Sequence, residues 1–265
     1  MILPNMTPEE KVKQMEKLLP FIKEIGFKWI ERNFLKTIVK TKYFPTCYTR
    51  ELDLSSHGMG KWTMVYVAES KSNVRKGIVA IRAYQKFYVS HSKNPSNNGV
   101  GIYECLPDDY GHVECVEYSP HYFNRIRERM IEPKGIVQPS FDDLVKRVIC
   151  DHFYRIDDIV TGGSYEMNDN GFYDWVPNDL YDRKDGFKNL VGYHEDGLTL
   201  GVFTRGYKSF LTYVPNSMLY QKQIDKKSIR MTEIAELKLR LRYNPFYKFE
   251  KKTVLSTDGE EVFKF

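Results

Sequence analysis

Hydrophobic and polar positions change their period several times along the chain, and each change predicts a new element. The first period is helical, because Thr7 can cap a helix that begins at Pro8 and carries acidic residues in its first turn. Apolar residues follow at helical spacing, namely Val12, Met15, Leu18, Leu19 and Ile22. We expect this helix to run to about residue 24, with a kink allowed at Pro20. Gly26 should break it before a second helix over 27–39, so the N-terminus predicts a helical hairpin.

From about residue 61 the period shortens toward the alternation of a half-buried strand. Four runs rich in β-branched and aromatic residues follow, separated by polar, turn-prone stretches: residues 62–67, 77–82, 100–105 and 112–118. They predict four antiparallel strands. Two helices should come next, one over 120–131 and one that begins at Ser140 and ends near residue 152.

The pattern is less regular in the second half of the chain. Residues 161–186 are rich in Gly, Asn, Asp and Tyr, and they form either a functional flap or an irregular excursion. We expect them to be the most mobile part of the core. Apolar runs at 190–193, 198–204 and 207–214, joined by glycine-containing turns, predict a three-stranded meander. The stripe Ile234, Leu237 and Leu241 favours a helix over 228–243, although 237–242 also alternates like a strand, and 257–260 predicts a small hairpin.

These elements predict an α+β fold with an antiparallel or mixed sheet, an N-terminal helical hairpin and two central helices. We divide it into a hairpin at 1–45, an α+β core at 46–225 and a C-terminal extension at 226–265 packed on that core. The composition agrees, because 42% hydrophobic residues can fill a core and 14% aromatic residues favour strands.

Charge and cysteine usage narrow the class of protein. The net charge of +5 permits an anionic partner without requiring one, and ordinary surface charge is the simpler explanation. No apolar run approaches the roughly 18 residues that a membrane helix needs, and residues 1–10 lack a secretory pattern, so we expect a soluble, cytoplasmic protein without membrane contact. The cysteines, at 47, 105, 115 and 150, show no C-x-x-C spacing, which favours buried free thiols.

The segment 118–130 carries the most informative group of polar residues. Ser119 can cap a helix with Pro120 in its first turn, and His121, Arg125 and Arg129 then repeat every four residues along one helical face. Guanidinium groups pair with phosphate oxygens, helix N-termini favour anions, and an imidazole moves protons near neutral pH. The face could therefore bind a phosphodiester and assist its cleavage without metal. The simpler explanation from spacing alone is a solvated helix face on which the arginines pair with acids such as Glu128.

This pattern resembles the small toxin-like domains related to the BrnT and RelE ribonucleases. The matching pieces are Ser119, His121, Arg125 and Arg129, the helix from Ser140, and the strands over 198–213, within about 113–223. The resemblance implies a mixed α/β sheet that binds RNA or an antitoxin-like protein. It also implies His121 as acid or base and Arg125 and Arg129 as phosphate ligands.

Other chemistry has weaker support in the sequence. There is no Walker loop, no G-x-G-x-x-G, no G-x-S-x-G and no H-E-x-x-H, so we expect neither cofactor nor metal. A metal-dependent hydrolase would need three of the His and Asp residues to converge, among them His152 and the nearby Asp151, Asp157 and Asp158.

Two hypotheses therefore remain. The first is a metal-independent ribonuclease-like or RNA-binding protein, and the second is a non-catalytic accessory or interaction protein of a phage or mobile element. Gathering of basic residues around His121 would favour the first, with Arg205 and Lys208 as nucleic-acid contacts beside Lys61, Arg82 and Lys86. Neutralisation of the arginines by acids would favour the second.

Overall fold

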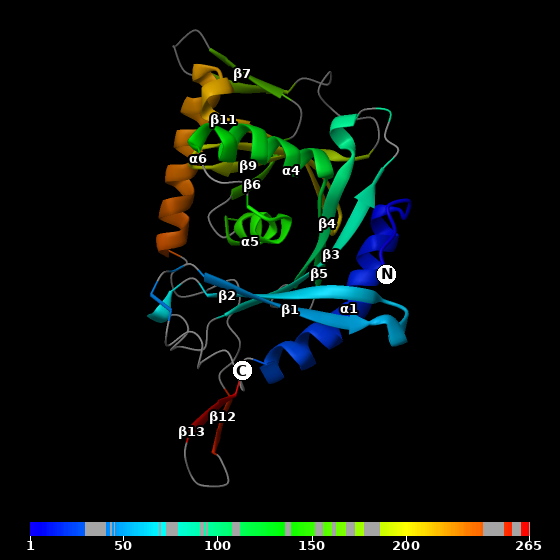
Figure 1. The fold of residues 1–265 in the computed structure, drawn as a ribbon. Coiled ribbons are helices and arrows are strands. Elements are labelled where there is room, and N and C mark those ends of the chain that lie inside the picture. The colour runs from blue at the N-terminus through cyan, green and yellow to red at the C-terminus, as the bar shows by residue number, and fades with distance from the viewer. Residues whose placement is uncertain are drawn as a thin grey trace.

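One mixed sheet of nine strands forms the centre of the computed structural model of the chain (Figure 1). The strands lie in the order β1 (Thr46–Leu54), β2 (Gly60–Ala68), β3 (Ala80–Val89), β4 (Gly99–Pro107), β5 (Val113–Tyr118), β11 (Tyr207–Pro215), β10 (Gly197–Thr204), β9 (Lys188–His194) and β6 (Ile156–Val160). The structure describes residues 1–29, 41–42, 44, 46–68, 70–72, 79–90, 93, 95–107, 112–135, 139–151, 156–160, 163–167, 173–177, 186–240, 252–255 and 261–264.

A single parallel pairing joins two antiparallel parts of this sheet. Strands β1 to β5 pair antiparallel, each with the next strand in the chain. Strands β11, β10, β9 and β6 also pair antiparallel, in that order across the sheet. Between them, Tyr207 to Phe210 of β11 lie parallel to Cys115 to Tyr118 of β5. The four expected antiparallel strands and the later meander are confirmed. Strand β1, which the sequence reasoning missed, adds an edge beside β2.

The N-terminal helix α1 (Pro8–Trp29) begins as the sequence predicts but ends later. The Thr7 amide donates to Glu10 Oε2 at 2.8 Å and the Glu10 amide donates to Thr7 Oγ1 at 3.3 Å, which together form a capping box. The helix continues through Pro20 and Gly26, so the break expected at Gly26 is wrong and the hairpin is not confirmed. A helical glycine costs only about 1 kcal/mol relative to alanine, which core packing of the helix offsets. Residues 30–40 lie outside the described part.

Helices cover both faces of the sheet. On one face, Met15, Leu18 and Ile22 of α1 pack with residues of β2 to β5 in one buried cluster. On the other face, α4 (Pro120–Ile126) and α5 (Phe141–Asp151) bury their apolar sides against alternate residues of the same strands and against β11. The two central helices are therefore confirmed. Because α1 contributes to the core directly, residues 8–22 are part of the same packed unit as the sheet.

The remaining elements are short or lie in the C-terminal third. They are η2 (Ser55–His57), η3 (Pro95–Asn97), the π turn η4 (Arg127–Ile131), η5 (Glu132–Lys134), β7 (Gly163–Met167), β8 (Tyr173–Pro177), η7 (Asn216–Met218), α6 (Gln221–Arg240), β12 (Lys252–Leu255) and β13 (Glu261–Lys264). Strands β7 and β8 pair within the segment 161–186, whose other residues up to 185 are not described, and its expected mobility stays a prediction. Helix α6 confirms the expected C-terminal helix, and the pairing of β12 with β13 confirms the small hairpin.

A buried ion pair lies between the sheet and the helices α4 and α5. Arg82 Nη1 of β3 donates to Glu104 Oε1 of β4 at 2.8 Å, and the side chains are only 2% and 0% exposed. The Tyr118 hydroxyl donates to the other carboxylate oxygen of Glu104 at 3.0 Å. Arg82 is therefore part of the core and is excluded from the set of cations that could reach a nucleic acid.

We predict that breaking this pair destabilises the fold strongly. Glu104→Gln should lower the free energy of unfolding by about 3 kcal/mol or more, because it leaves the Arg82 charge uncompensated in the interior. Urea unfolding measures this loss. The double change Arg82→Met with Glu104→Leu should recover most of it, since apolar groups of similar volume need no partner. A single variant as stable as the wild type would show that the pair is not buried as described.

Candidate functional site

Ser119 fixes the start of α4 and joins it to β11. Its hydroxyl group accepts a hydrogen bond from the Tyr122 amide at 3.1 Å and donates one to the Leu211 carbonyl at 3.2 Å. Its own amide donates to the Phe210 carbonyl at 3.1 Å. The capping role predicted for Ser119 is thus confirmed, and the contact with β11 adds a role that the sequence did not indicate.

A β-bulge in β11 makes this contact possible. Leu200 of β10 faces Thr212 and the next residue, Gly201, faces Phe210, so Leu211 is an extra residue in the ladder. A Cβ atom at Gly201 would lie 2.2 Å from the Ser209 carbonyl oxygen, so only glycine fits opposite the bulge. The bulge leaves the Leu211 carbonyl directed at Ser119, while 42% of the Leu211 residue stays exposed.

The predicted His121, Arg125 and Arg129 face does not continue as one straight line. Residues 120–126 are α-helical, but 127–131 form a π turn whose hydrogen bonds span one residue more. Arg129 therefore turns toward β11, where its Nη1 donates to the Tyr213 carbonyl at 2.7 Å. The structure brings His121 and Arg125 together and commits Arg129 to a contact within the fold.

Arg125 is also engaged with its neighbours. Its Nε donates to His121 Nε2 at 3.3 Å, and its Nη1 forms an ion pair with Glu128 Oε2. An imidazole nitrogen that accepts a hydrogen bond has no proton of its own to donate. Nε2 is then occupied as an acceptor and cannot act as a general acid.

The other cations of the RNA hypothesis do not gather around His121. Lys208 Nζ pairs with Glu114 Oε2 at 2.9 Å, and Lys86 pairs with Asp142. Arg205 lies in the exposed β10–β11 turn, where the neighbouring Gly206 carbonyl accepts from the Cys115 amide near the start of β5. His121 follows the other end of β5. Arg205 and Lys208 therefore lie toward the far end of this strand pair from His121.

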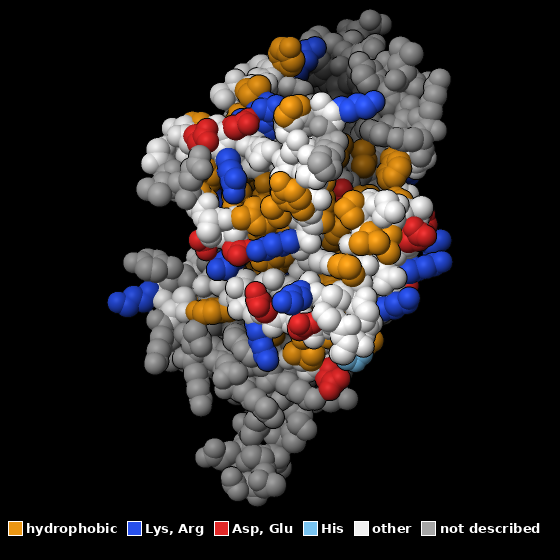
Figure 2. Space-filling model, turned by 45° about the vertical axis from the view of Figure 1, so that its right-hand side comes forward, with side chains coloured by type: hydrophobic (Ala, Val, Ile, Leu, Met, Phe, Trp, Pro, Cys, Tyr) orange, Lys and Arg blue, Asp and Glu red, His pale blue; other side chains and the backbone are white. Residues whose placement is uncertain are grey.

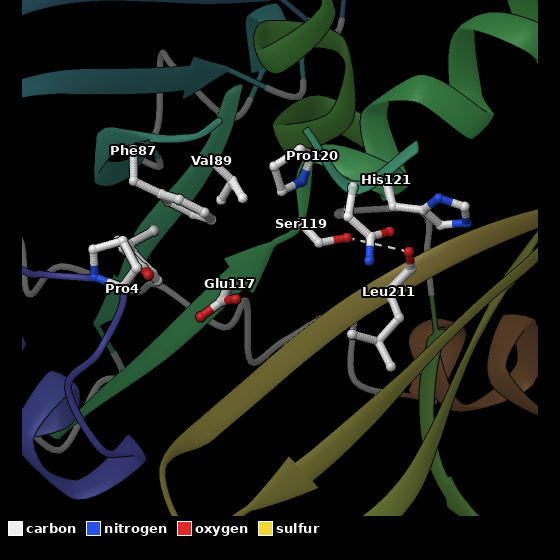
Figure 3. Close-up of a pocket in the computed structure, with 10 residues that line it drawn as sticks. Pro4, Phe87, Val89, Glu117, Ser119, Pro120, His121 and Leu211 are labelled. Carbon is white, nitrogen blue, oxygen red and sulfur yellow. Dashed lines mark hydrogen bonds between the residues drawn. The ribbon is translucent and has the colours of Figure 1, made fainter. Parts of the chain in front are cut away.

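A pocket of about 450 Å³ opens beside His121 on the face of the sheet that α1 covers. Phe87, Val89 and Pro120 lie along one side of it, Pro4 and Leu211 lie at opposite ends, and Glu117 and Ser119 lie between them (Figure 3). Asn97, Tyr103 and His121 complete the lining. The His121 imidazole points away from Glu117 in this view, so the two titratable groups share a pocket without facing each other.

Glu117 is the central polar group of this pocket and was missed by the sequence reasoning. Its Oε2 accepts from Lys11 Nζ at 2.8 Å and from the Tyr207 hydroxyl at 2.7 Å, which links α1, β5 and β11. The Lys11 ammonium also lies 4.8 Å from the ring centroid of Tyr103. Burial, and then the charge of Glu117, raise the pKa of Tyr103 and of Tyr207, so both phenols stay neutral.

A stacked aromatic pair forms one wall of the pocket. The rings of Phe87 and Tyr103 lie 4.3 Å apart at an interplanar angle of 22°. Phe87 faces Gly101 across β3 and β4, and a Cβ atom at Gly101 would lie 2.4 Å from Phe87 Cζ. The missing side chain at Gly101 therefore lets the Phe87 ring lie flat over β4 and stack on Tyr103.

Metal ligands do not cluster among the described residues, and two of the cysteines are buried. No three His, Cys, Asp or Glu side chains gather there as ligands, and the side chains of Asp151, His152, Asp157 and Asp158 lie outside the described part. Cys105 and Cys115 face each other across β4 and β5 as free buried thiols, as the sequence predicts. Burial raises the pKa of both thiols, which disfavours the reactive thiolate. Within the same residues, no helix has the length and apolar character needed to cross a bilayer.

Comparisons with known proteins do not assign a function to this site. No family model, no curated protein and no solved structure matches the chain. The resemblance of 113–223 to toxin-like ribonucleases therefore stays a hypothesis.

We predict that Ser119 stabilises the fold more than an ordinary helix cap. Ser119→Ala should lower the free energy of unfolding by about 2 kcal/mol, because it removes both the cap of α4 and the donor to Leu211. Ser140, which accepts from the Asp143 amide at 3.2 Å, is the matched control, and Ser140→Ala should cost about 1 kcal/mol. Equal losses in denaturant unfolding would show that the contact with the bulge contributes nothing.

Proposed function

We propose that this chain is a non-catalytic interaction protein that binds a partner protein at the surface around the pocket beside His121. The observation that carries this proposal is the engagement of the cations on that side of the molecule. Arg125 is paired with Glu128, and Arg129 is bonded to the Tyr213 carbonyl.

Engaged cations are a poor basis for binding RNA. Nucleic-acid affinity comes largely from basic groups that neutralise phosphates and release counterions. A phosphate at Arg129 would compete with the Tyr213 carbonyl for Nη1, and a charge-assisted hydrogen bond is worth about 1.5 to 3 kcal/mol. On the face seen in Figure 2, blue and red side chains are interspersed around an apolar area, without a continuous basic surface.

Catalysis by proton transfer has equally little support. Cleavage of a phosphodiester without metal needs a base and an acid within hydrogen-bond reach of the same substrate. Glu117 Oε2 already accepts from Lys11 and Tyr207, and His121 Nε2 accepts from Arg125. An apolar pocket beside an exposed leucine, in contrast, is typical of a surface that another protein covers.

RNA binding is the competing hypothesis, and an RNA-binding assay tests it. We expect no salt-sensitive binding of a labelled single-stranded RNA between about 50 and 200 mM salt, measured by fluorescence anisotropy. The double variant Arg125→Ala with Arg129→Ala should change RNA binding little and lower the melting temperature instead. Salt-sensitive binding that this double variant loses while it remains folded would overturn the proposal and support the ribonuclease-like hypothesis.

A second test compares two exposed aliphatic residues, one in the pocket and one outside it. Leu211 lines the pocket and is 42% exposed, whereas Ile229 lies on α6 and is 60% exposed. Affinity capture from the native cytoplasm, quantified by mass spectrometry, should recover partner proteins that Leu211→Asp loses and Ile229→Asp retains. Identical recovery by the two folded variants would place binding elsewhere or exclude it.

A further inference from the structure

Glu117 supplies a carboxylate acceptor to a mostly apolar pocket, whose lining also includes the polar side chains of Asn97, Ser119 and His121. Within the described residues, the hydrogen bonds and ion pairs of Glu117 all go to Oε2, which leaves Oε1 able to accept another donor. The Glu117 side chain is 17% exposed, so a ligand in the pocket can reach it. A ligand with a hydrogen-bond donor is therefore favoured over one that is wholly apolar.

The charge state of this acceptor selects against ions. Lys11 lies 2.8 Å from the Glu117 carboxylate, so the pair has no net charge. An anion would be repelled by the carboxylate, and a cation at Oε1 would meet a carboxylate whose charge the Lys11 ammonium already balances, which weakens its attraction. A neutral O–H or N–H donor meets no such repulsion.

The shape and chemistry of the walls select a flat ring. Phe87 belongs to the stacked pair with Tyr103, and Pro4, Val89 and Pro120 supply further apolar surface (Figure 3). Aromatic rings pack well against other rings and against proline. The volume of about 450 Å³ falls in the range of clefts that bury one small ligand, roughly 300 to 1,000 Å³.

We propose that this pocket receives the side chain of a tyrosine from the partner protein. The ring lies between Phe87 and Leu211, and the phenol hydroxyl donates to Glu117 Oε1. This inference rests on the proposed function, because it names the group by which the partner is recognised. Tyrosine is a common anchor at protein interfaces, where it buries a large ring and keeps one polar contact. The engaged cations around the pocket favour this source of an aromatic donor over a nucleobase, whose phosphates would find few partners.

The test uses the full chain and a matched pair of probes. N-acetyl-tyrosine amide and N-acetyl-phenylalanine amide differ only in the hydroxyl, and guanosine serves as the nucleobase probe. We expect the tyrosine probe to shift the methyl NMR signals of Val89 and Leu211 with a Kd of about 1 mM or tighter. The phenylalanine probe should bind about tenfold or more weakly, because it lacks the donor to a charged acceptor.

Two tryptophan variants separate filling of the pocket from general effects. Val89 lines the pocket, whereas its neighbour Tyr88 is 68% exposed and is absent from the lining. Val89→Trp should abolish the tyrosine-dependent shift of the Leu211 methyl signals, and Tyr88→Trp should leave that shift unchanged.

Equal binding of the two amide probes, no shift at about ten times the expected Kd, or tighter binding of guanosine would each overturn the tyrosine assignment. The proposed function has its own readout, because capture that is lost in Leu211→Asp requires no knowledge of the anchoring side chain. If the tyrosine assignment fails while the Leu211-dependent capture remains, the chain is still an interaction protein, and a different side chain of the partner is its anchor. Identical capture by Leu211→Asp and Ile229→Asp would instead exclude the proposed interaction surface.

Discussion

The parallel pairing of β5 with β11 is the constraint on which the rest of the structure depends. It spans only Cys115 to Tyr118, yet it is the one place where the two antiparallel parts of the sheet meet. Two side chains, one on β5 and one in the turn that follows it, reinforce this pairing. Glu117 accepts from Tyr207 of β11 and from Lys11 of α1, and Ser119 bonds the bulge at Leu211 while it starts α4. A short parallel ladder is thereby held by groups from four elements.

The same junction explains the character of the candidate site. The pocket exists because β11 bulges outward at Leu211 and because Gly101 lets the Phe87 ring lie over β4. Arg129, which the sequence-based hypothesis assigns to phosphate binding, instead helps to hold this junction. Arg129 bonds the Tyr213 carbonyl just beyond the bulge, and Glu117 holds Lys11. What remains toward solvent is a mostly apolar cavity with a carboxylate whose charge Lys11 balances, which suits recognition of a neutral side chain better than cleavage of a phosphodiester.

The local sequence pattern predicted most of the helices and strands, whereas long-range contacts determine the features that it did not predict. The cap at Thr7, the β-rich run over 62–67 and the turn at Gly206 are signals within a few residues, so the sequence reveals them. The break expected at Gly26 was wrong because packing of α1 on the sheet outweighs the weak local preference of one glycine. His121 and Arg125 do lie together, since α-helical spacing places them so. The π turn that redirects Arg129 and the pairing of Glu117 with Lys11 across 106 residues leave no local signal.

The central claim is that the arginines beside the pocket serve the fold. Its most direct test is the mobility of their guanidinium groups, measured by NMR as rotation about the Nε–Cζ bond and hydrogen exchange at Nε. Arg205, in the exposed β10–β11 turn, provides the reference. The account predicts slow rotation and slow exchange for Arg125 and Arg129, because each guanidinium is held by a hydrogen-bond partner in the fold. Rotation and exchange as fast as at Arg205 would contradict it and would return both groups to the set available for an anionic ligand.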